Sequence, residues 1–265
     1  MSKSEIQRAS RTALITGASS GIGLELARVF AREGYNLVLV ARNVERLDEI
    51  AKELRALGVS VKSMPMDLAD PHAPQAICDG LRKESGVVDV LVNNAGFGSH
   101  GFFHENDPAT ELSMIQVNVT ALTELTRLFL PDMIKRGEGG VLNVASTAAF
   151  QPGPLMAVYY ATKAYVLSFS EAIAEELRGT GVTVTTLCPG PTLTGFQGRA
   201  GTGEMRMLKG GLVLDAAMVA KIGYEGLIHN KTVVIPGFKN RILAFGVRLT
   251  PRQWVTRVAR QMNET

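Results

Sequence analysis

Strand-like and helix-like patterns alternate along almost the whole of this 265-residue chain, and this alternation limits the folds that it can adopt. Short apolar runs, of the kind that is buried on both sides of a parallel sheet, are separated by longer segments with helical periodicity. Parallel strands joined through helices form right-handed crossovers, which build a doubly wound sheet with helices on both faces. The sequence therefore predicts one α/β domain with a Rossmann-like parallel sheet of about seven strands.

The expected elements follow from these patterns and from the turn residues between them. We expect strands at 12–16, 36–41, 60–66, 87–92, 140–145, 182–187 and 232–235. Helices are expected at 22–33, 44–57, 74–84, 111–135, 158–178 and 216–229. Residues 1–10 are expected to form a disordered tail, and the single domain to cover 11–265. Within it we expect a substrate lid at about 195–211 and a helical extension at about 239–263.

Composition argues against several classes of protein. The formal net charge is only +3 and no dense block of Lys or Arg occurs, which argues against nucleic-acid binding. Cys78 and Cys188 belong to no CxxC or Cys/His group, so neither a disulfide scaffold nor a metal site is expected, and a reducing, cytoplasmic environment is favoured. The polar N-terminus lacks the apolar core of a signal peptide, and no apolar run approaches the ~18 residues of a membrane span.

A glycine-rich run follows the first expected strand. Glycines at positions 17, 21 and 23 give the spacing G-x-x-x-G-x-G immediately before an expected helix. Glycine permits a tight turn and a close approach of the backbone, and a helix N-terminus attracts a pyrophosphate. The alternative is a strand–helix turn in which glycine only relieves strain. The place of the run between the first strand and a helix favours a nucleotide cradle.

Arg42 stands at the end of the second expected strand, with no carboxylate before Asn43. In NAD-binding folds an acidic residue at this point accepts hydrogen bonds from the ribose hydroxyls, whereas an arginine suits a 2′-phosphate. A solvated arginine at a strand end is the alternative. Ser20, between the glycines, is neutral where a second cation would have strengthened the preference. We therefore predict NADP(H) as the cofactor.

Tyr159 and Lys163 are four residues apart on an expected helix, so they share one face of it. A free tyrosine titrates near pH ~10, and a neighbouring ammonium is expected to lower the pKa of the phenol toward the range useful for acid–base catalysis. Together with the nucleotide loop, this pair predicts hydride chemistry. Tyr160 points to a different side of the helix and is expected to pack or to line the cofactor pocket.

The chain resembles the short-chain dehydrogenase/reductase family, in its compact single-domain branch. The resemblance covers about residues 12–195, and its motifs occur in the family's order. Each motif is weak by itself, and together they are highly specific. They are TGxxxGxG at 16–23, Asp67, Asn93-Asn94-Ala95-Gly96, Asn118, Ser146, YxxxK at 159–163 and Pro189-Gly190.

The resemblance implies roles for four catalytic residues. Tyr159 would exchange a proton with a carbonyl or alcohol oxygen as hydride moves to or from the nicotinamide, and Ser146 would stabilise the charge on that oxygen. Lys163 would lower the pKa of the tyrosine and bind the nicotinamide ribose. Asn118 would anchor a water that links Lys163 to solvent; a polar residue that bonds locally within its helix is the alternative for Asn118.

The resemblance also implies a set of cofactor-binding residues. Asp67 would contact the adenine, where an N-cap before the turn at Pro71 is the alternative. The segment 94–96 would line the adenine-ribose side, and Thr192 and Thr194 would hold the nicotinamide carboxamide. The expected set is Gly17, Ser19, Ser20, Gly21, Ile22, Gly23, Arg42, Asp67, Leu68, Asn94, Ala95, Gly96, Tyr159, Lys163, Pro189, Gly190, Thr192 and Thr194.

Two segments bear on the substrate. Six glycines between 195 and 211 suit a mobile lid, with a solvated loop as the alternative. The C-terminal segment lacks the Val-Asp-Gly-Gly-like ending of bacterial 3-oxoacyl carrier-protein reductases and mixes apolar residues with arginines. It is more similar to the branch with broad carbonyl, hydroxysteroid or long-chain acyl substrates. We expect it to pack on its own domain or on a partner subunit, in preference to a peripheral contact with a membrane.

These patterns predict an enzyme that transfers hydride between NADP(H) and the carbonyl or secondary alcohol of a hydrophobic small molecule. One alternative is a 3-oxoacyl-thioester reductase of lipid synthesis. Another is a non-catalytic NADP(H)-binding regulatory protein, against which the intact Ser146, Tyr159 and Lys163 speak. By resemblance, we expect a homodimer or homotetramer formed through the helices that contain Asn118 and Tyr159.

Overall fold

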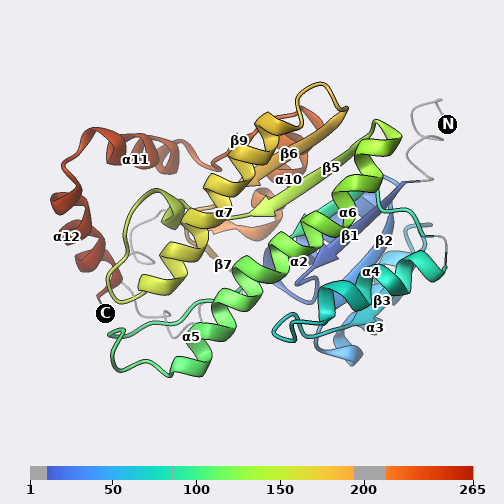
Figure 1. The fold of residues 1–265 in the computed structure, drawn as a ribbon, viewed down its shortest axis with the longest axis horizontal. Coiled ribbons are helices and arrows are strands. Elements are labelled where there is room, and N and C mark those ends of the chain that lie inside the picture. The colour runs from blue at the N-terminus through green and yellow to red at the C-terminus, as the bar shows by residue number, and fades with distance from the viewer. Residues whose placement is uncertain (1–10, 85, 194–212, 265) are drawn as a thin grey trace.

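A seven-stranded parallel sheet forms the centre of the molecule in the computed structural model (Figure 1). The structure describes residues 11–84, 86–193 and 213–264. The sheet has the order β3-β2-β1-β4-β5-β6-β9, and each neighbouring pair is parallel. Its strands are β1 (Thr12–Thr16), β2 (Asn36–Ala41), β3 (Val61–Pro65), β4 (Val90–Asn93), β5 (Gly139–Val144), β6 (Val182–Leu187) and β9 (Val233–Val234). The predicted fold class is confirmed.

Helices cover both faces of the sheet, because successive strand residues point to opposite sides. Ala13 and Ile15 of β1 are buried with one set of helices, whereas Leu14 between them is buried with the other. The first set is α2 (Gly21–Arg32), α3 (Val44–Arg55) and α10 (Ala216–Ile228). The second is α4 (Ala73–Lys83), α6 (Leu122–Arg136) and α7 (Ala157–Glu176).

The order of the strands reverses between β1 and β4. From β1 the chain moves outward through β2 to β3, and it then returns to start the other half of the sheet at β4. Crossovers on the two sides of this point lead in opposite directions, which opens a crevice at the carboxyl ends of the strands. The glycine-rich run follows β1 and Asn94 follows β4, so both lie at this crevice.

The long helix expected at 111–135 is divided into three parts. It consists of α5 (Pro108–Ile115), a π-helical turn η1 (Gln116–Ala121) and α6. It begins earlier than expected because the Asp107 side chain caps α5, accepting hydrogen bonds from two N–H groups of the first turn. A π-turn holds more residues per turn than an α-helix, and hydrophobic periodicity did not reveal it.

Several other elements differ from the expected ones. The strand expected at 87–92 begins only at Val90, and the one expected at 232–235 retains two residues. Two short strands that were not expected, β7 (Thr192–Leu193) and β8 (Leu214–Asp215), pair in a separate sheet. The expected tail at 1–10 and the expected lid at 195–211 lie outside the described residues.

The C-terminal extension forms two helices, α11 (Phe238–Leu249) and α12 (Arg252–Asn263). The break falls at Thr250, whose backbone is extended, as favoured for a residue that precedes a proline. Both helices lie at one end of the molecule, far from β2 and β3 (Figure 1). No helix within the described ranges has the length and apolar composition needed to cross a bilayer.

Candidate functional site

A cavity of about 1100 Å³ lies at the carboxyl ends of the strands, where parallel α/β sheets bind ligands. The loops that follow β1, β2, β3, β4, β5 and β6 contribute to its wall, together with α7, α11 and α12. Among the described members of the predicted set, every residue lines this cavity except Gly23 and Asn118. Thr194 lies outside the described residues.

The glycine-rich loop has the shape that a nucleotide cradle requires. Gly17 and Gly21 adopt φ values of +65° and +56°, in the left-handed region that favours glycine. A Cβ on Gly23 would collide with the carbonyl oxygen of Gly17 and with Nδ2 of Asn94. Gly21 and Ile22, in the first turn of α2, border the cavity, and a helix N-terminus favours an anion. These residues fit a dinucleotide whose pyrophosphate lies against the loop.

Asn94 ties the glycine-rich loop to the end of β4. Its Nδ2 donates to the carbonyl oxygens of Thr16 at 2.9 Å and Gly17 at 3.2 Å. In return, Oγ1 of Thr16 accepts hydrogen bonds from the N–H groups of Asn94 and Ala95, each at 3.0 Å. Because these bonds fix both loops, little main chain remains to be ordered when a nucleotide binds.

Arg42 and Asp67 are neighbours at the ends of β2 and β3. Nη1 of Arg42 is 3.9 Å from Oδ2 of Asp67, and the arginine side chain is 69% exposed. An ion pair that is this long and exposed is weak, so the guanidinium remains available for an anionic ligand. Oδ1 of Asp67 accepts a hydrogen bond from the N–H of Ala69 at 3.0 Å, so the carboxylate also shapes its own loop.

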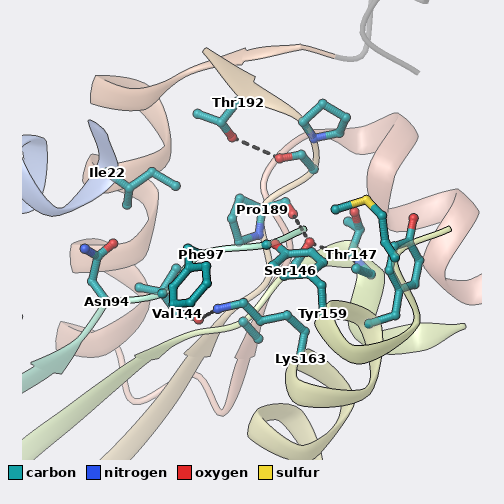
Figure 2. A pocket seen from close by; sticks show the side chains of 18 of the residues that line it. Ile22, Asn94, Phe97, Val144, Ser146, Thr147, Tyr159, Lys163, Pro189 and Thr192 are labelled. Carbon is teal, nitrogen blue, oxygen red and sulfur yellow. Dashed lines mark hydrogen bonds between the residues drawn. The ribbon is translucent and has the colours of Figure 1, made fainter. Parts of the chain in front are cut away.

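Ser146, Tyr159 and Lys163 come together in the cavity (Figure 2). Ser146 follows β5 and caps the short 3-10 helix η2 (Thr147–Phe150). Tyr159 and Lys163 project from the first turns of α7. Nζ of Lys163 donates to the carbonyl oxygen of Val144 at 2.8 Å and lies 5.9 Å from the centre of the Tyr159 ring. Lys163 therefore holds α7 against β5, the strand that precedes Ser146.

Burial is the main influence on the pKa values of Tyr159 and Lys163. Desolvation raises the pKa of Tyr159 to about 12, and a hydrogen bond with Ser146 acts in the opposite direction. Desolvation also lowers the pKa of Lys163 to about 8. The pKa of Tyr159 therefore lies above its ordinary value, opposite to the predicted direction, because burial is the largest influence on it. Tyr159 is thus held as a protonated phenol.

Tyr160 has a different environment from Tyr159. Its hydroxyl donates to Oδ1 of Asn263 at 3.0 Å, and the residue is 5% exposed. Its ring fills the space next to Gly153, where a Cβ would collide with it. These contacts give Tyr160 a packing role between α7 and α12, although the residue also borders the cavity.

Asn118 lies in the π-turn η1 and is 1% exposed. Nδ2 donates to the carbonyl oxygen of Phe97 at 3.0 Å and to Oγ1 of Thr162 at 3.1 Å, and Oδ1 accepts from the N–H of Phe97 at 3.1 Å. The alternative of purely local bonding is wrong, because both partners belong to other elements. Asn118 connects the loop after β4 to α7 next to Lys163; its predicted role in anchoring a water stays a prediction.

The loop after β6 also borders the cavity, next to Ser146. Oγ of Ser146 donates to the carbonyl oxygen of Pro189 at 3.4 Å, and Oγ1 of Thr192 donates to that of Gly190 at 2.9 Å. Gly190 lies so close to Asn240 of α11 that a Cβ would be 2.5 Å from Nδ2 of that side chain. The predicted carboxamide site is therefore packed against the C-terminal extension.

The sequence predictions did not include the C-terminal helices in the site. One face of each helix lines the cavity, with Leu243, Val247, Trp254, Val255, Val258 and Met262 among its residues. The i, i+4 spacing of Trp254, Val258 and Met262 was a signal that this face is apolar. Phe97 and Met156 also line the cavity and add apolar surface to its wall. Phe102 is exposed, and Phe150 packs against a small core cluster.

Asn263 fastens the end of α12 over the site. It is fully buried, and Nδ2 donates to the carbonyl oxygen of Pro154 at 2.9 Å. Oδ1 accepts the hydrogen bond from Tyr160, and the main-chain oxygen is 2.8 Å from Nε2 of His100. One residue thereby joins α12 to the loop after β4, to the loop before α7 and to α7 itself.

Comparison with known proteins places this site in context. Residues 11–204 match the family model described as short chain dehydrogenase. The ketoacyl reductase HetN of Nostoc sp. is 36% identical over 180 residues, which is 68% of this chain and 63% of HetN, so the match spans less than two thirds of that relative. A short-chain dehydrogenase from Sphingobium yanoikuyae in complex with NADPH is 36% identical with a TM-score of 0.81, over 91% of this chain and 94% of that chain. The bulky-bulky ketone specific alcohol dehydrogenase from Comamonas testosteroni is 30% identical with a TM-score of 0.76, over 92% and 96% of the two chains.

Proposed function

The chain belongs to the short-chain dehydrogenase/reductase family, and on that basis we propose that it transfers hydride between NADP(H) and the carbonyl or secondary alcohol of a hydrophobic small molecule. The observation that carries this proposal is the meeting of three features in one cavity. A glycine cradle, a buried phenol held in its protonated form and an apolar wall all border the same space. A cavity used only to bind a nucleotide would not need the phenol.

The proposed reduction transfers one hydride and one proton to the carbonyl group of the substrate. Bound NADPH would supply the hydride to the carbonyl carbon. Tyr159 donates its phenolic proton to the carbonyl oxygen, and the hydroxyl of Ser146 donates a hydrogen bond to the same oxygen as negative charge develops. Lys163, with its pKa lowered to about 8, still carries a charge at neutral pH, and this charge stabilises the phenolate that remains. The phenolate then regains a proton from solvent, and the products are the alcohol and NADP⁺.

Arg42 supports NADP(H) over NAD(H). Its guanidinium borders the cavity, is mostly exposed and has only a long contact with Asp67. An arginine fork suits a phosphate dianion and interacts more strongly with it than with an uncharged ribose hydroxyl. The relative from Sphingobium yanoikuyae, whose structure contains NADPH, agrees with this preference.

The apolar wall supports a bulky, hydrophobic substrate. It comes from α11 and α12, whose inner faces present aliphatic side chains and Trp254 toward the cavity. Burial of such surface favours an apolar ligand by about 25 cal/mol per Å². The relative from Comamonas testosteroni is named as specific for bulky-bulky ketones, and the match covers 92% of this chain.

A thioester substrate is a second candidate, because the relative HetN is named as a ketoacyl reductase. NADPH oxidation should be followed with acetoacetyl thioester and with a series of aryl and polycyclic ketones under the same conditions. We expect a higher kcat/KM for the hydrophobic ketones. A higher value for the thioester would favour the second candidate. Tight NADPH binding without turnover of either class would favour a regulatory protein.

We further propose a homodimer formed through the outer faces of α5 and α7. Leu112 and Ile115 of α5 are exposed, and so is Tyr165 of α7. The ring of Tyr165 stacks on that of Phe169, with 5.6 Å between the ring centroids. These side chains lie on the elements that adjoin Asn118 and Tyr159. Leu112→Glu should lower the molar mass measured by light scattering to that of one chain; an unchanged mass would place the interface elsewhere.

A further inference from the structure

The helix α11 carries an apolar stripe that no other part of the described chain covers. Phe238, Ile242, Phe245 and Leu249 are spaced i, i+4, i+7 and i+11, which places them on one helix face. Their exposed fractions are 75%, 54%, 62% and 76%. The face on the other side of the helix is the packed one, since Asn240 and Ala244 are buried there. The stripe therefore points away from the domain, although Ile242 at its edge also borders the cavity.

Cations surround this stripe, and no acidic residue occurs between 238 and 263. In helical projection Lys239 flanks the stripe on one side, and Arg241 and Arg248 flank it on the other. The exposed cations of α11 and α12 are Lys239, Arg241, Arg248, Arg252, Arg257 and Arg260. Within the described residues, Arg260 pairs with Glu264 at 3.2 Å, and no ion pair is found for the other five.

The charge of the chain is strongly segregated. The whole sequence has 28 basic and 25 acidic residues. The six cations of the segment 238–263 leave 22 basic against 25 acidic residues for the rest, so a formal charge of +6 sits on 26 residues while the remainder carries −3. A solvated surface helix has no need of such an imbalance. The excess of cations on residues 238–263 gives the stripe a strongly positive border.

The combination of an apolar stripe with a cationic border selects one kind of partner. A second copy of this chain, stripe against stripe, would bring like charges together at the border of the contact, which is unfavourable. A bilayer with anionic lipids offers apolar chains to the stripe and negative head groups to the cations at the same time. We propose that α11 lies in the plane of an anionic membrane surface, with its stripe in the interface and the cations of both helices on the head groups.

Such docking would place the cavity next to the bilayer. One face of α11 and one face of α12 line the same cavity as Tyr159, so the cavity adjoins the helices that would lie on the membrane. A hydrophobic ketone dissolved in the membrane would then have a short path to Tyr159. This last consequence rests on the proposed function, whereas the docking itself does not.

Sedimentation with sucrose-loaded vesicles tests the docking without any substrate. The full chain is mixed with vesicles of phosphatidylcholine alone, or of seven parts phosphatidylcholine and three parts phosphatidylglycerol. We expect binding to the anionic vesicles in low salt, at least tenfold weaker binding to the neutral vesicles, and loss of binding at about 0.5 M salt, where charges are screened within a few ångströms. Absence of binding to anionic vesicles in low salt, or equal binding to both kinds, would overturn the proposal.

Two double variants test the location, and neither changes a cavity residue. Phe245→Ser with Leu249→Ser should weaken binding about tenfold or more through loss of buried apolar area. Arg248→Gln with Arg252→Gln should weaken it by roughly 30-fold, about fivefold for each cation. The matched controls are Leu57→Ser with Val87→Ser, and Lys83→Gln with Lys135→Gln; these residues are exposed, lie outside α11 and α12 and should leave binding unchanged.

Two further results decide between the membrane and a second copy. All variants should keep the NADPH affinity of the parent chain, which shows that they fold. The Phe245/Leu249 variant should also keep the parent's sedimentation coefficient. A smaller particle for this variant would make the stripe a contact between copies and overturn the proposal, as would control variants that lose vesicle binding as strongly as the stripe variants.

Discussion

The nucleotide side and the substrate side of the cavity are held together by different kinds of contact. On the nucleotide side, glycines and main-chain groups fix the geometry: Asn94 bonds to the carbonyls of Thr16 and Gly17, and Gly23 leaves no room for a Cβ. On the substrate side, side chains from distant elements meet, as in the bonds of Asn263 to Pro154 and Tyr160. The first side therefore depends on backbone shape and the second on long-range packing.

Tyr159→Phe tests the point at which the two sides meet, and its effect should be the largest. Removal of the proton donor should reduce kcat by about 10²–10⁴ while the NADPH affinity changes less than twofold. Tyr160→Phe is the matched control, because it removes the hydroxyl that bonds to Asn263 and leaves Tyr159 in place. Steady-state kinetics and NADPH fluorescence titration measure both quantities. Retention of a tenth or more of the turnover by Tyr159→Phe would assign the proton transfer to another group.

Gly23→Ala tests whether backbone shape controls the nucleotide side. The added Cβ would meet the Gly17 carbonyl and Asn94, so the loop must shift, at a cost of about 1–3 kcal/mol. We expect NADPH affinity to fall by ten- to a hundredfold. Gly246→Ala in α11 is the control, because nothing lies within 4 Å of its Cβ position. If both variants bind NADPH equally well, the close contact is not a determinant of binding.

Arg42→Ala separates the cofactor preference from the shape of the loop. Loss of one charge-assisted contact of about 1.4 kcal/mol should raise the Kd for NADPH about tenfold and leave that for NADH nearly unchanged. The control is Arg46→Ala, an exposed arginine nearby that pairs with Glu49. Equal losses for the two cofactors would show that Arg42 does not bind the 2′-phosphate.

The pH dependence of reduction tests which group titrates near neutral pH. Tyr159 has a pKa of about 12 and stays protonated, whereas Lys163 has a pKa of about 8 and loses its charge as the pH rises through that value. Loss of the ammonium removes the stabilisation of the phenolate, so kcat should fall about threefold between pH 7.5 and 8.5. Lys163→Arg keeps its charge in this range and should give a flat profile at a lower rate. An identical fall in the arginine variant would assign the titration to another group.

Asn263→Ala should have the smallest effect and should act on the substrate side alone. The variant loses the hydrogen bonds with which Asn263 holds α12 over the site; we call these bonds the Asn263 clamp. We therefore expect a two- to fivefold higher KM for a bulky ketone and no change in NADPH affinity. The conservative Asn263→Asp keeps the acceptor for Tyr160 and should restore part of the KM. Gln261→Ala, at an exposed position of the same helix, is the control. A loss of NADPH affinity as large as the rise in KM would show that the Asn263 clamp supports both the nucleotide side and the substrate side of the cavity.

The sequence was informative where contacts are short-range in the chain or depend on the backbone. The strands β2 and β6 and the start of α3 at Val44 begin where they were expected, because apolar runs and turn residues mark them directly. The glycine loop was predictable because its geometry requires glycine. The clamp at Asn263 was not, since nothing local marks its partners Tyr160 and His100. The pKa of Tyr159 was predicted in the wrong direction because sequence shows that a cation is four residues away, but not how deeply both groups are buried.

The π-turn η1 makes the number of residues between Pro108 and Arg136 part of the geometry that supports the site. Its extra residue sets the rotation at which Asn118 meets Phe97 and Thr162. A helix advances about 100° per residue, so a single-residue deletion that relaxed the turn into a regular helix would swing one of the flanking segments by that angle. Chimeras built by exchanging α5 or α6 between relatives must therefore conserve the length of this segment, even where its composition is free to change.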